Sequence, residues 1–528
     1  MHQLRFSRIA VFILSSFMMA VLLLSGSAAH AQKKVHLKQA DNAKRGKKGD
    51  ERYERLLGNV ILTQNKTTIH CDSAHLYKKR NSVEAFGHVH ILEGDSIDIT
   101  GSRLEYDGNT KKAKLRNKVV FTKLATATLY TDHLDFSRTQ NLAYYYNGGR
   151  LVDSINVLTS NKGYYNTLSN LASFKKNVNV KNPDYTMTAD SLQYNSRTKI
   201  IYFVTETTVV NKDSSTFVYK NGIYNTRTKV FDGKKGTGES EDYTIVGDNY
   251  DFDGIRNVGK VRGNVVMTSK KENLQIYGQA SDYFKARGIT KVYDNAYVAK
   301  VTDDNDTLYM SADTLVSIDN EDETKKRLLA YHNVKIYKKD MQGVADSLEY
   351  RPTDSTIYFY NKPVLWSQGN QMTADSLRML IKNNTISRIY LIANAFVISQ
   401  DTLLNFNQIK GRKMTAELAN SKINKVIVLG NGESLYYILD DKTKDFMGMN
   451  KIICSNITIR FVAGQVNNLS FYVKPDAQFI PPHELKFDQK ILKGFDWRGD
   501  KKPKREDVVK SAKSPAEIKP PPIKKAVQ

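Results

Sequence analysis

The sequence predicts an all-β protein, built as an elongated, solenoid-like stack of bent antiparallel strands with a repeat of about 30 residues. A short motif recurs at nearly constant spacing, Val, Ile, Thr and Tyr are frequent between short turn clusters, and long helical periodicity is absent. β-branched and aromatic residues favour strands. Constant spacing indicates stacked supersecondary units, each of which buries its apolar face only against its neighbours.

The recurring motif forms the first half of each repeat. Its clearest copies, Met187–Tyr194, Met310–Leu315, Val344–Tyr350 and Met372–Met379, share Ala-Asp-Ser/Thr-Leu. Neighbouring copies of its last position lie 28 to 33 residues apart. The positions equivalent to Tyr194 are Tyr77, Tyr106, Phe136, Tyr165, Tyr224, Phe252, Phe284, Ser317, Tyr350 and Met379.

The second half of each repeat begins with Gly or Asn ahead of Val, as in Gly58-Asn59-Val60, Gly263-Asn264-Val265 and His332-Asn333-Val334. Gly and Asn tolerate the backbone angles of a bulge or a tight bend. Polar clusters such as Asn195-Ser196-Arg197 separate the two halves. One repeat is therefore predicted to be two strands joined by a polar turn.

The apolar pattern changes phase within the motif. Met187 and Ala189 share one parity, whereas Leu192 and Tyr194 share the other. Because side chains alternate faces along a strand, this change means that the strand turns a corner and keeps its apolar side inward. Strands that bend from one sheet into another build a two-walled structure with an apolar interior.

The two ends of the chain differ in composition from the repeats. Basic Arg5 and Arg8, an apolar run of sixteen residues and Ala29-His30-Ala31 are typical of a secretory signal peptide, although an uncleaved anchor is the alternative. The predicted parts are a signal peptide (1–31), a flexible basic leader (32–50), the repeat array (51–430), a β segment that continues or caps the array (431–497) and a disordered basic, Pro-rich tail (498–528).

The formal net charge of +24 would suggest nucleic acid as a partner in a cytosolic protein, but an exported protein rarely meets nucleic acid. No nucleic-acid partner is therefore predicted. The charge spread through the repeats is read either as solvated strand faces or as attraction to an anionic ligand or membrane surface. The two cysteines, Cys71 and Cys454, are expected to be small buried side chains, with an intermolecular disulfide as the alternative.

Enzymatic motifs are absent: the sequence has no Gly-x-Ser-x-Gly elbow, phosphate-binding loop or His-Glu-x-x-His pair. No enzyme activity, cofactor or metal is predicted, although His88 and His90 could form a metal pair on one strand face. The repeated aspartates at the corner are read as structural, because a short acidic side chain can accept backbone N–H bonds that a bend leaves unpaired. They are Asp190, Asp313, Asp346 and Asp375.

The columns of apolar residues are read either as a packed core or as an open groove for an acyl chain. The groove candidates are Val60, Leu62, Val89, Ile91, Met187, Ala189, Leu192, Tyr194, Phe203, Val265, Met267, Met310, Leu315, Leu348, Tyr350, Met372 and Leu377.

The combination of Ala-Asp-Ser-Leu-x-Tyr (Ala189–Tyr194), a polar turn and Gly-Asn-Val resembles the OstA/LptA family of lipopolysaccharide-transport proteins over most of residues 53 to about 430. The resemblance implies a β-jellyroll exported to the periplasm of a Gram-negative-type envelope. It also implies a slot that holds the lipid A acyl chains of lipopolysaccharide as molecules pass from the inner to the outer membrane.

The resemblance further implies inner- and outer-membrane transport components of the same fold as partners, joined edge to edge through a segment such as Met449–Val473. Because no large barrel follows the array, a periplasmic bridge contributing to outer-membrane assembly is favoured. The basic tail could add membrane association. The alternatives are a structural or adhesive β-rod with a packed core, and a polysaccharide-processing β-solenoid enzyme.

Overall fold

This computed structural model describes residues 34–509, except 124–126, 154, 303–304, 384, 420–421, 441 and 463–464. The predicted signal peptide, residues 1–31, lies outside the described residues. The chain divides into two compact units, residues 1–174 and 175–528. Within the described residues, no helix is both long and apolar enough to cross a bilayer.

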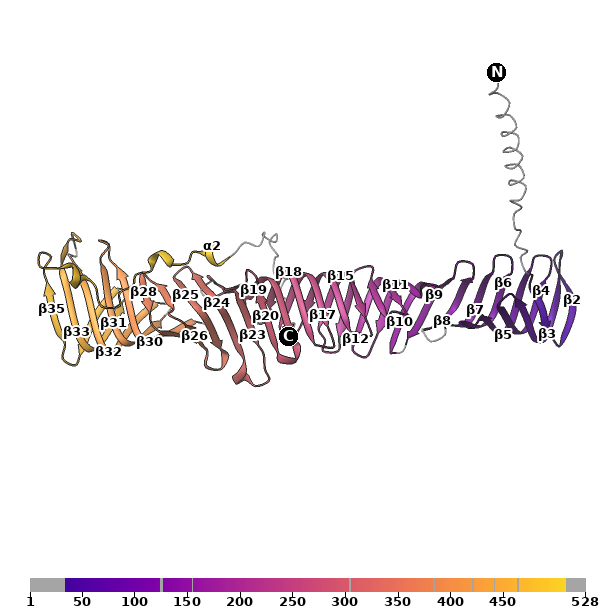
Figure 1. Cartoon of the computed structure of the whole chain (residues 1–528), viewed down its shortest axis with the longest axis horizontal. Helices are drawn as coiled ribbons and strands as arrows, with labels where there is room; N and C mark the ends of the chain where they lie inside the picture. The colour runs from indigo at the N-terminus through magenta and orange to yellow at the C-terminus, as the bar shows by residue number, and fades with distance from the viewer. Residues whose placement is uncertain are drawn as a thin grey trace, which may run out of the picture. The chain divides into compact units, whose positions relative to one another are not determined.

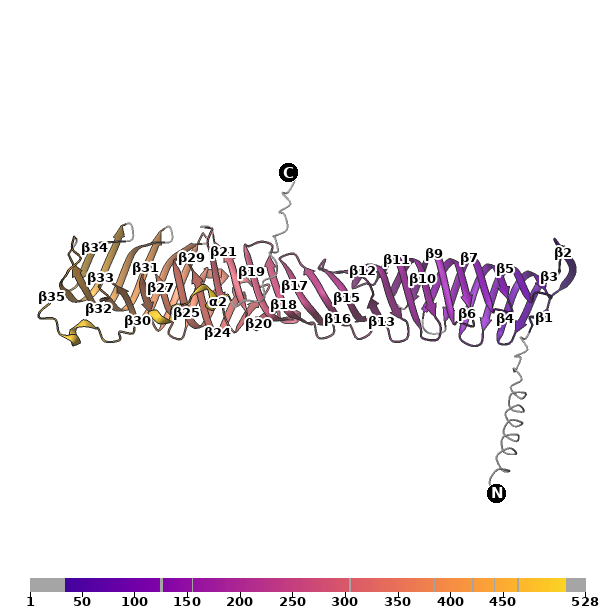
Figure 2. The ribbon, with the colours of Figure 1, turned by 90° about the horizontal axis from the view of Figure 1, so that it is seen from above.

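The first unit is a series of antiparallel strands that follow one another in sequence (Figures 1 and 2). The strands are β1 (His36–Gln39), β2 (Asn42–Lys48), β3 (Glu51–Gln64), β4 (Thr67–Tyr77), β5 (Ser82–Glu93), β6 (Ile97–Asp107), β7 (Lys112–Lys123), β8 (Ala127–Ser137), β9 (Leu142–Asp153) and β10 (Asn156–Asn166). The boundary between the units falls within β11 (Leu171–Lys181).

The second unit continues the same pattern, with several of its strands split into two pieces. Its strands are β12 (Tyr185–Asn195), β13 (Ile200–Phe203), β14 (Thr207–Asn211), β15 (Thr216–Asn225), β16 (Val230–Glu239), β17 (Tyr243–Asp253), β18 (Val258–Ser269), β19 (Leu274–Phe284), β20 (Ile289–Tyr293), β21 (Tyr297–Val301), β22 (Thr307–Ser311), β23 (Thr314–Ile318), β24 (Arg327–Lys338), β25 (Met341–Arg351), β26 (Thr356–Tyr360), β27 (Val364–Ser367), β28 (Asn370–Thr373), β29 (Ser376–Lys382), β30 (Thr385–Gln400), β31 (Phe406–Ala419), β32 (Lys422–Leu439), β33 (Phe446–Val462), β34 (Gln465–Tyr472) and β35 (Asp476–Ile480).

Short helical turns interrupt the strands of the second unit. They are the 3-10 turns η1 (Lys285–Arg287), η2 (Glu323–Lys325), η3 (Pro352–Asp354), η4 (Phe487–Lys490) and η5 (Gly499–Lys501), and the α-helix α2 (Arg505–Val508). The predicted all-β class and the stack of bent antiparallel strands are confirmed.

Each long strand turns a corner near its middle. On β3, two residues with positive φ, Gly58 and Asn59, lie opposite the single residue Asp72 of β4, so the register shifts there by one residue. Left-handed pairs recur at Gly263-Asn264 and His332-Asn333. The bulged strand bends but keeps its inward parity, since Leu56 and Val60 are both buried, whereas the facing strand β4 changes parity between the buried residues Cys71 and Ala74. The predicted phase change therefore occurs on the strand that faces the bulge.

The strand register revises two members of the predicted repeat series. Val83 of β5 pairs with Leu76 on one side and with Tyr106 on the other, so Leu76, and not Tyr77, occupies the inward position. On β18, Gly259 pairs with both Phe252 and Tyr283, which displaces Phe284. Both predicted positions lie one residue beyond the inward position, because a spacing that varies from 28 to 33 residues does not fix the register to a single residue.

The corners divide each unit into two walls. We call wall A the half-strands that carry the position of Tyr194, such as residues 191–195 of β12, and wall B the half-strands that carry the position of Met187, such as residues 185–189. On β12 the inward residues Tyr185, Met187, Leu192 and Tyr194 are buried, and the alternate residues are exposed or half-buried. The core of each unit lies between its two walls.

Residues 36–48 differ from the expected flexible leader. β1 and β2 pair with β3, from His36 opposite Thr63 to Lys48 opposite Glu51. Lysine has low strand propensity, but a strand at the end of a stack needs only backbone hydrogen bonds on one side and leaves its side chains in water. The expectation failed because composition does not report such edge pairing.

The C-terminal region also differs from expectation beyond β35. Strands continue to Ile480, after which residues 481–509 form an irregular segment, here called the strap, that runs back alongside the strands to β24 and ends with α2 (Figure 1). Residues 498–509 therefore have a defined path, and residues 510–528 of the predicted tail lie outside the described residues. The strap is held by specific side-chain bonds to its backbone, which composition could not reveal.

A glycine at a corner allows a direct test of the bulge. We expect Gly263→Ala to lower the stability of the second unit by about 1–2 kcal/mol, because φ is +77° and the new Cβ would lie 2.6 Å from Asp248 Oδ2. Gly259→Ala, on the same strand with its nearest contact at 3.6 Å, should change stability by less than about 0.5 kcal/mol. Urea unfolding midpoints measure both; equal midpoints would contradict the corner's role.

Candidate functional site: the apolar interior between the walls

The register places every predicted groove residue on the inward face of its unit. On β12, Leu192 pairs with Phe203 and Met187 pairs with Val209, so that inward residues of neighbouring strands form continuous columns. Most of the predicted residues are buried. Those that are only half-buried are Ala189, Met267, Met310 and Tyr350. The inward residues thus form apolar columns, and the exposure of their side chains varies along them.

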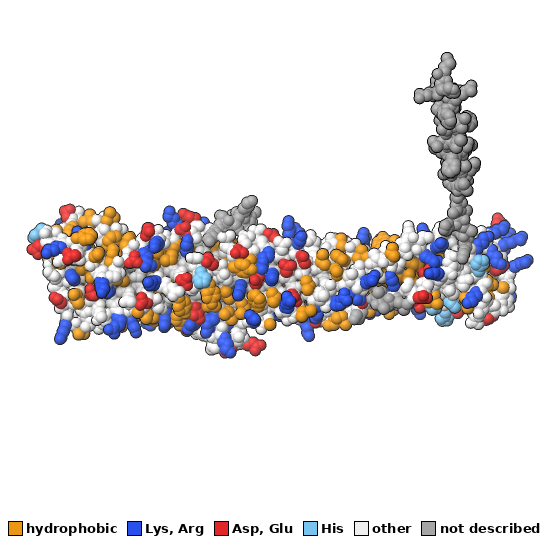
Figure 3. Space-filling view, viewed as in Figure 1, with side chains coloured by type: hydrophobic (Ala, Val, Ile, Leu, Met, Phe, Trp, Pro, Cys, Tyr) orange, Lys and Arg blue, Asp and Glu red, His pale blue; other side chains and the backbone are white. Residues whose placement is uncertain are grey.

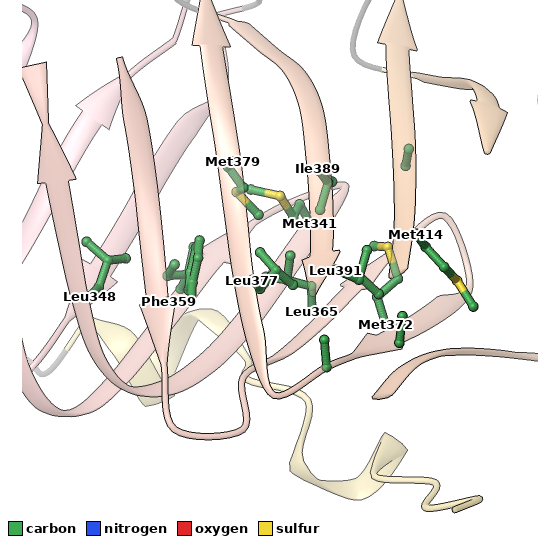
Figure 4. Close-up of a cluster of buried hydrophobic side chains, with 14 of the residues drawn as sticks. Met341, Leu348, Phe359, Leu365, Met372, Leu377, Met379, Ile389, Leu391 and Met414 are labelled. Carbon is green, nitrogen blue, oxygen red and sulfur yellow. The ribbon is translucent and has the colours of Figure 1, made fainter. Parts of the chain in front are cut away.

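Part of the interior is tightly packed. In the second unit, Leu348 and Phe359 on wall A and Met341, Leu365 and Met372 on wall B form one buried cluster between the walls (Figure 4). Beside it, a cavity of about 50 Å³ is lined by residues from both walls, including Met372, Leu391 and Met414. Since a water molecule accounts for about 30 Å³ in the liquid, this cavity is too small for an acyl chain.

In the first unit, polar side chains link the two walls across the open edge of the stack, here called the mouth. Gln64 Nε2, at the wall B end of β3, donates to the Gly108 carbonyl beyond the wall A end of β6 at 2.8 Å. The Tyr106 hydroxyl donates to Gln64 Oε1 at 2.5 Å, and burial raises the pKa of Tyr106 to about 12. Arg138 Nε likewise lies 2.6 Å from Glu93 Oε1. These links seal the apolar interior of this unit from water.

The first strands of the second unit carry similar links. Lys229 Nζ lies 3.0 Å from Asp184 Oδ2, and Lys285 Nζ lies 2.9 Å from Asp213 Oδ2. Hydrogen bonds from Ser215 and then from Lys285 lower the pKa of Asp213 to about 2. Each pair joins a turn of wall A to a turn of wall B, so the mouth is bridged there as well.

From β17 to β25 the mouth has a different character. Apart from the Lys285–Asp213 pair, the ion pairs at the mouth here join turns and strands of the same wall, as between Lys270 and Glu239 and between Lys300 and Glu272. Inward apolar side chains near the mouth are accordingly exposed: Phe252 by 37%, Tyr283 by 42% and Leu328 by 43%.

The opposite wall of this section is also partly accessible. Its half-buried inward residues on wall B are Ile245, Met267, Ile276, Val298, Leu308 and Met310. Figure 3 shows hydrophobic side chains gathered over the part of the second unit that contains β20 to β24. We call this stretch, from β17 to β25, the open section.

Aromatic rings fill the interior where the open section begins, from β15 to β17. The Tyr250 hydroxyl, on wall A of β17, reaches the wall B carbonyl of Gly236 on β16 at 2.7 Å. Tyr219 packs against Phe231 with ring centroids 4.4 Å apart and against Tyr250 at 5.3 Å. Sequence reasoning missed this cluster. The sequence feature that could have predicted the cluster is the run of inward glycines on β16, because a Cβ at Gly233 or Gly236 would clash with these rings.

The corner aspartates contact side chains around the bend. Asn333 Nδ2 donates to Asp313 Oδ2 at 2.7 Å, and Asn394 Nδ2 donates to Asp375 Oδ2 at 2.8 Å. Asp346 accepts from Asn361 Nδ2 at 3.1 Å. Asp190 instead accepts from the neighbouring Ser191 hydroxyl at 3.4 Å. These four carboxylates thus accept from side-chain amides and hydroxyls, whereas the sequence suggested backbone N–H groups.

The histidines of the first unit are not brought together as a metal pair. His88 occupies the corner of β5 and its Nδ1 lies 2.8 Å from Asp72 Oδ2, whereas His90 Nε2 lies 3.0 Å from Asp98 Oδ1. The bulge at the corner separates the two rings, which a regular strand would have placed on one face. Within the described ranges, no group of three or more His, Cys, Asp or Glu residues could hold a metal ion.

Two solved structures that resemble the chain do so only weakly. LptH, the LptA-homologous periplasmic component of the lipopolysaccharide transport device of Pseudomonas aeruginosa, is 16% identical over 21% of this chain and 75% of its own, with a TM-score of 0.18. The WD40 domain of SCAP from fission yeast is 8% identical over 82% and 95%, with a TM-score of 0.10. Similarities this low support no conclusion about the fold or function of the chain. No curated protein matches the sequence significantly.

Family models give the informative matches. Residues 32–190 match the model described as OstA-like protein. Residues 244–385 match the model described as LptA/(LptD N-terminal domain) LPS transport protein. Together the two matches cover more than half of the chain, and they include both the sealed first unit and most of the open section. With its repeated Ala-Asp-Ser-Leu-x-Tyr and Gly-Asn-Val motifs and its stack of bent strands, the chain belongs to the OstA/LptA-like family of lipopolysaccharide-transport proteins.

Proposed function

We propose that this protein binds lipopolysaccharide through its acyl chains, within the interior between the walls, and carries it from the inner to the outer membrane without enzymatic chemistry. The observation that supports this most is the open section, where an inward apolar surface changes from buried to accessible. In a soluble protein, a large exposed apolar surface rimmed by polar residues commonly marks a binding site.

The chemistry of the open section suits an alkyl chain. Its walls offer aliphatic and aromatic side chains together with the flexible methionines Met267 and Met310, which adapt to irregular shapes. Burial of each methylene contributes about 0.8 kcal/mol, so several chains would be held firmly. The attraction is non-directional, which lets a bound lipid slide. Direction of movement must then come from an energised partner outside this chain.

The rim of the open section carries the charges that a phosphorylated headgroup would meet. Lys270 and Lys300 lie on the wall B edge, each already paired with a carboxylate. Arg287, on the wall A edge in η1, is exposed. An anionic headgroup would compete with Glu239 and Glu272 for the lysines. Rim charge therefore positions the headgroup, whereas affinity comes from the acyl chains.

The last strands of the second unit suggest how transport components of the same fold would attach. β34 and β35 each have β33 as their antiparallel partner among the described strands. The sequence of β34 holds no charged residue, and Leu469, Tyr472 and Phe479 nearby are exposed. In the first unit, β2 carries four basic residues among seven, which discourages edge pairing. The C-terminal edge is thus the better candidate for strand addition by a partner.

The proposed location is the periplasm, which the chain reaches through the predicted signal peptide. The basic tail is proposed to add membrane association.

The second candidate function is a structural envelope rod without a lipid ligand. The sealed mouth of the first unit and the packed cluster of Figure 4 favour it. Nucleic acid and catalysis have no part in either proposal.

Thiol labelling tests whether the open section is accessible. We expect Met267→Cys to react with a water-soluble maleimide at least about tenfold faster than Met187→Cys, because Met267 is half-buried and Met187, at the equivalent site on β12, is buried. Native Cys71 and Cys454 are free and buried, and burial raises the pKa of Cys71 to about 12, so their background at pH 8 is low. Equal rates would argue against an open section.

In-cell photo-crosslinking tests the ligand. A photoreactive residue at Met267 should form adducts containing lipid A, detected by mass spectrometry, whereas the same residue at outward-facing Thr268 should form none. A third variant at Met187 asks whether lipid reaches the sealed section. A folded protein without lipid adducts at either inward site would support the structural rod instead.

A further inference from the structure

Corners in both units share one hydrogen bond between neighbouring strands. The side chain of the second residue in the left-handed pair bonds to the aspartate at the corner of the preceding strand, at 2.7 to 2.9 Å. The bonded pairs are Asn59 with Asp41, His88 with Asp72, Asn264 with Asp248, Asn333 with Asp313 and Asn394 with Asp375. A side chain therefore fills the space beside each of these carboxylates and satisfies part of its hydrogen-bonding capacity.

The corner between β8 and β9 lacks such a side chain. Its left-handed pair is Asn147-Gly148, and the register places Gly148 beside the corner aspartate Asp132, as it places Asn264 beside Asp248. Apart from the chain neighbours of Gly148, no atom lies within 4 Å of a Cβ built there. Within the described ranges, the Asp132 carboxylate accepts one hydrogen bond, from the Lys118 N–H at 3.1 Å. It can therefore accept further donors.

A hollow of about 510 Å³ occupies the place of the missing side chain. Small-molecule sites in proteins have volumes of about 300–1,000 Å³, so the hollow could hold a small ligand. Its exposed lining residues are Lys118, Tyr130, Asp132, Asn147 and Arg150, which lie at the corner or on the outer face of wall B. Since the corner is in the middle of each strand and the mouth is at the strand ends, the hollow is separate from the mouth.

Two basic side chains at the hollow are available to an anion. Among the residues that the structure describes, neither Lys118 nor Arg150 forms an ion pair with a carboxylate. Nearby Arg116, by contrast, lies 2.8 Å from Asp135 Oδ1. Phosphate and carboxylate groups form charge-assisted hydrogen bonds with lysine and arginine. The hollow thus presents cations on one side and the Asp132 carboxylate on another.

Tyr130 adds an apolar surface to these charges. Its side chain is 42% exposed, and it lies in one outward row with Val120 and Arg150 on the neighbouring strands. The Arg150 guanidinium carbon is 5.5 Å from the centre of the Tyr130 ring, a contact that keeps the arginine beside the hollow. An aromatic ring buries the apolar C–H groups of a ligand well. A sugar ring has such C–H groups together with hydroxyl donors.

We propose that this hollow binds a sugar that carries a phosphate or carboxylate group. A sugar hydroxyl donates to Asp132 and replaces the side-chain donor found at other corners. The anionic group binds Lys118 and Arg150, and the sugar ring packs against Tyr130. Because the site lies on the outer face of the first unit, sugar binding there does not require an acyl chain in the interior and is independent of lipid carriage.

Saturation-transfer NMR on the full chain, in phosphate-free buffer, tests the site. We expect glucose 6-phosphate, glucuronate or both to bind with a Kd below about 1 mM, at least about tenfold tighter than glucose. The two probes distinguish the anions: binding of glucose 6-phosphate alone assigns the site to phosphorylated sugars, and binding of glucuronate alone assigns it to sugar acids. Inorganic phosphate should compete at least about tenfold more weakly than the bound sugar, because it lacks the ring and the hydroxyl donors.

Gly148→Asn restores the side chain that other corners have at this position. We expect the new amide to bond to Asp132, fill the hollow and weaken binding of the anionic sugar at least about tenfold. The urea midpoint should not fall, because asparagine tolerates a left-handed backbone and the Cβ meets no atom within 4 Å. Gly94→Asn is the matched control: Gly94 also has positive φ and open space around its Cβ, but it lies outside the hollow, so binding should persist.

Arg150→Gln tests the charge separately. It should weaken the anionic sugar at least about tenfold. Arg103→Gln, which alters an exposed arginine paired with Glu105 elsewhere in the first unit, should have no such effect. Urea midpoints of all four variants show whether each is folded.

Several results would overturn the proposal. They are glucose binding as tightly as the anionic sugars, inorganic phosphate competing as well as the bound sugar, and unchanged sugar binding in folded Gly148→Asn or Arg150→Gln. Loss of binding in folded Gly94→Asn or Arg103→Gln would place the sugar elsewhere and would also overturn it. A folded, unaltered protein that transfers no saturation to either anionic sugar would exclude the site outright.

Discussion

The corner in each long strand is the constraint on which the rest of the structure depends. A pair of left-handed residues such as Gly263-Asn264 inserts one extra residue and bends the strand, while Val261 and Val265 on either side both stay inward. The facing strand β17 changes its inward parity between Gly247 and Tyr250. Without the corner, half of the apolar set of the facing strand would face water. The carboxylate of Asp248 on the preceding strand accepts from Asn264 Nδ2 at 2.7 Å. This bond joins the corners of two neighbouring strands, so that both strands bend at the same level.

Once both halves of every strand face inward, the character of the interior depends on how the mouth is bridged. In the first unit Gln64 and Arg138 join the two walls, and the apolar columns beneath are buried. In the open section, Lys270 and Lys300 pair along one wall, and inward side chains such as Tyr283 meet solvent. The same fold thus provides a sealed core and an accessible surface by changing the partners of a few charged residues.

The outer surface of the second unit has its own organisation, which is unrelated to the interior columns. Gln371 and Gln408 face outward on wall B and are nevertheless fully buried, because the strap satisfies their amides. The terminal strands of the two units also differ, with lysines along β2 of the first unit and an uncharged β34 in the second. In a repeat protein, features outside the repeating core can therefore distinguish one terminal strand from the other and determine which partner binds.

The sequence by itself determined the strand architecture, the repeat and the inward columns, because strand parity and spacing are local properties of the chain. It placed Met187, Leu192 and Leu348 inward for that reason. It misplaced Tyr77 and Phe284 by one residue, since the spacing of the repeat does not fix the register of a strand against its neighbours. It also treated residues 36–48 as flexible, since edge pairing depends on a distant strand. Only the tertiary structure decided which columns are sealed, where the aromatic cluster lies and that the strap has a path. Each of these features depends on contacts between side chains that are far apart in sequence, either across the two walls or on the outer face. A local sequence pattern does not predict such contacts.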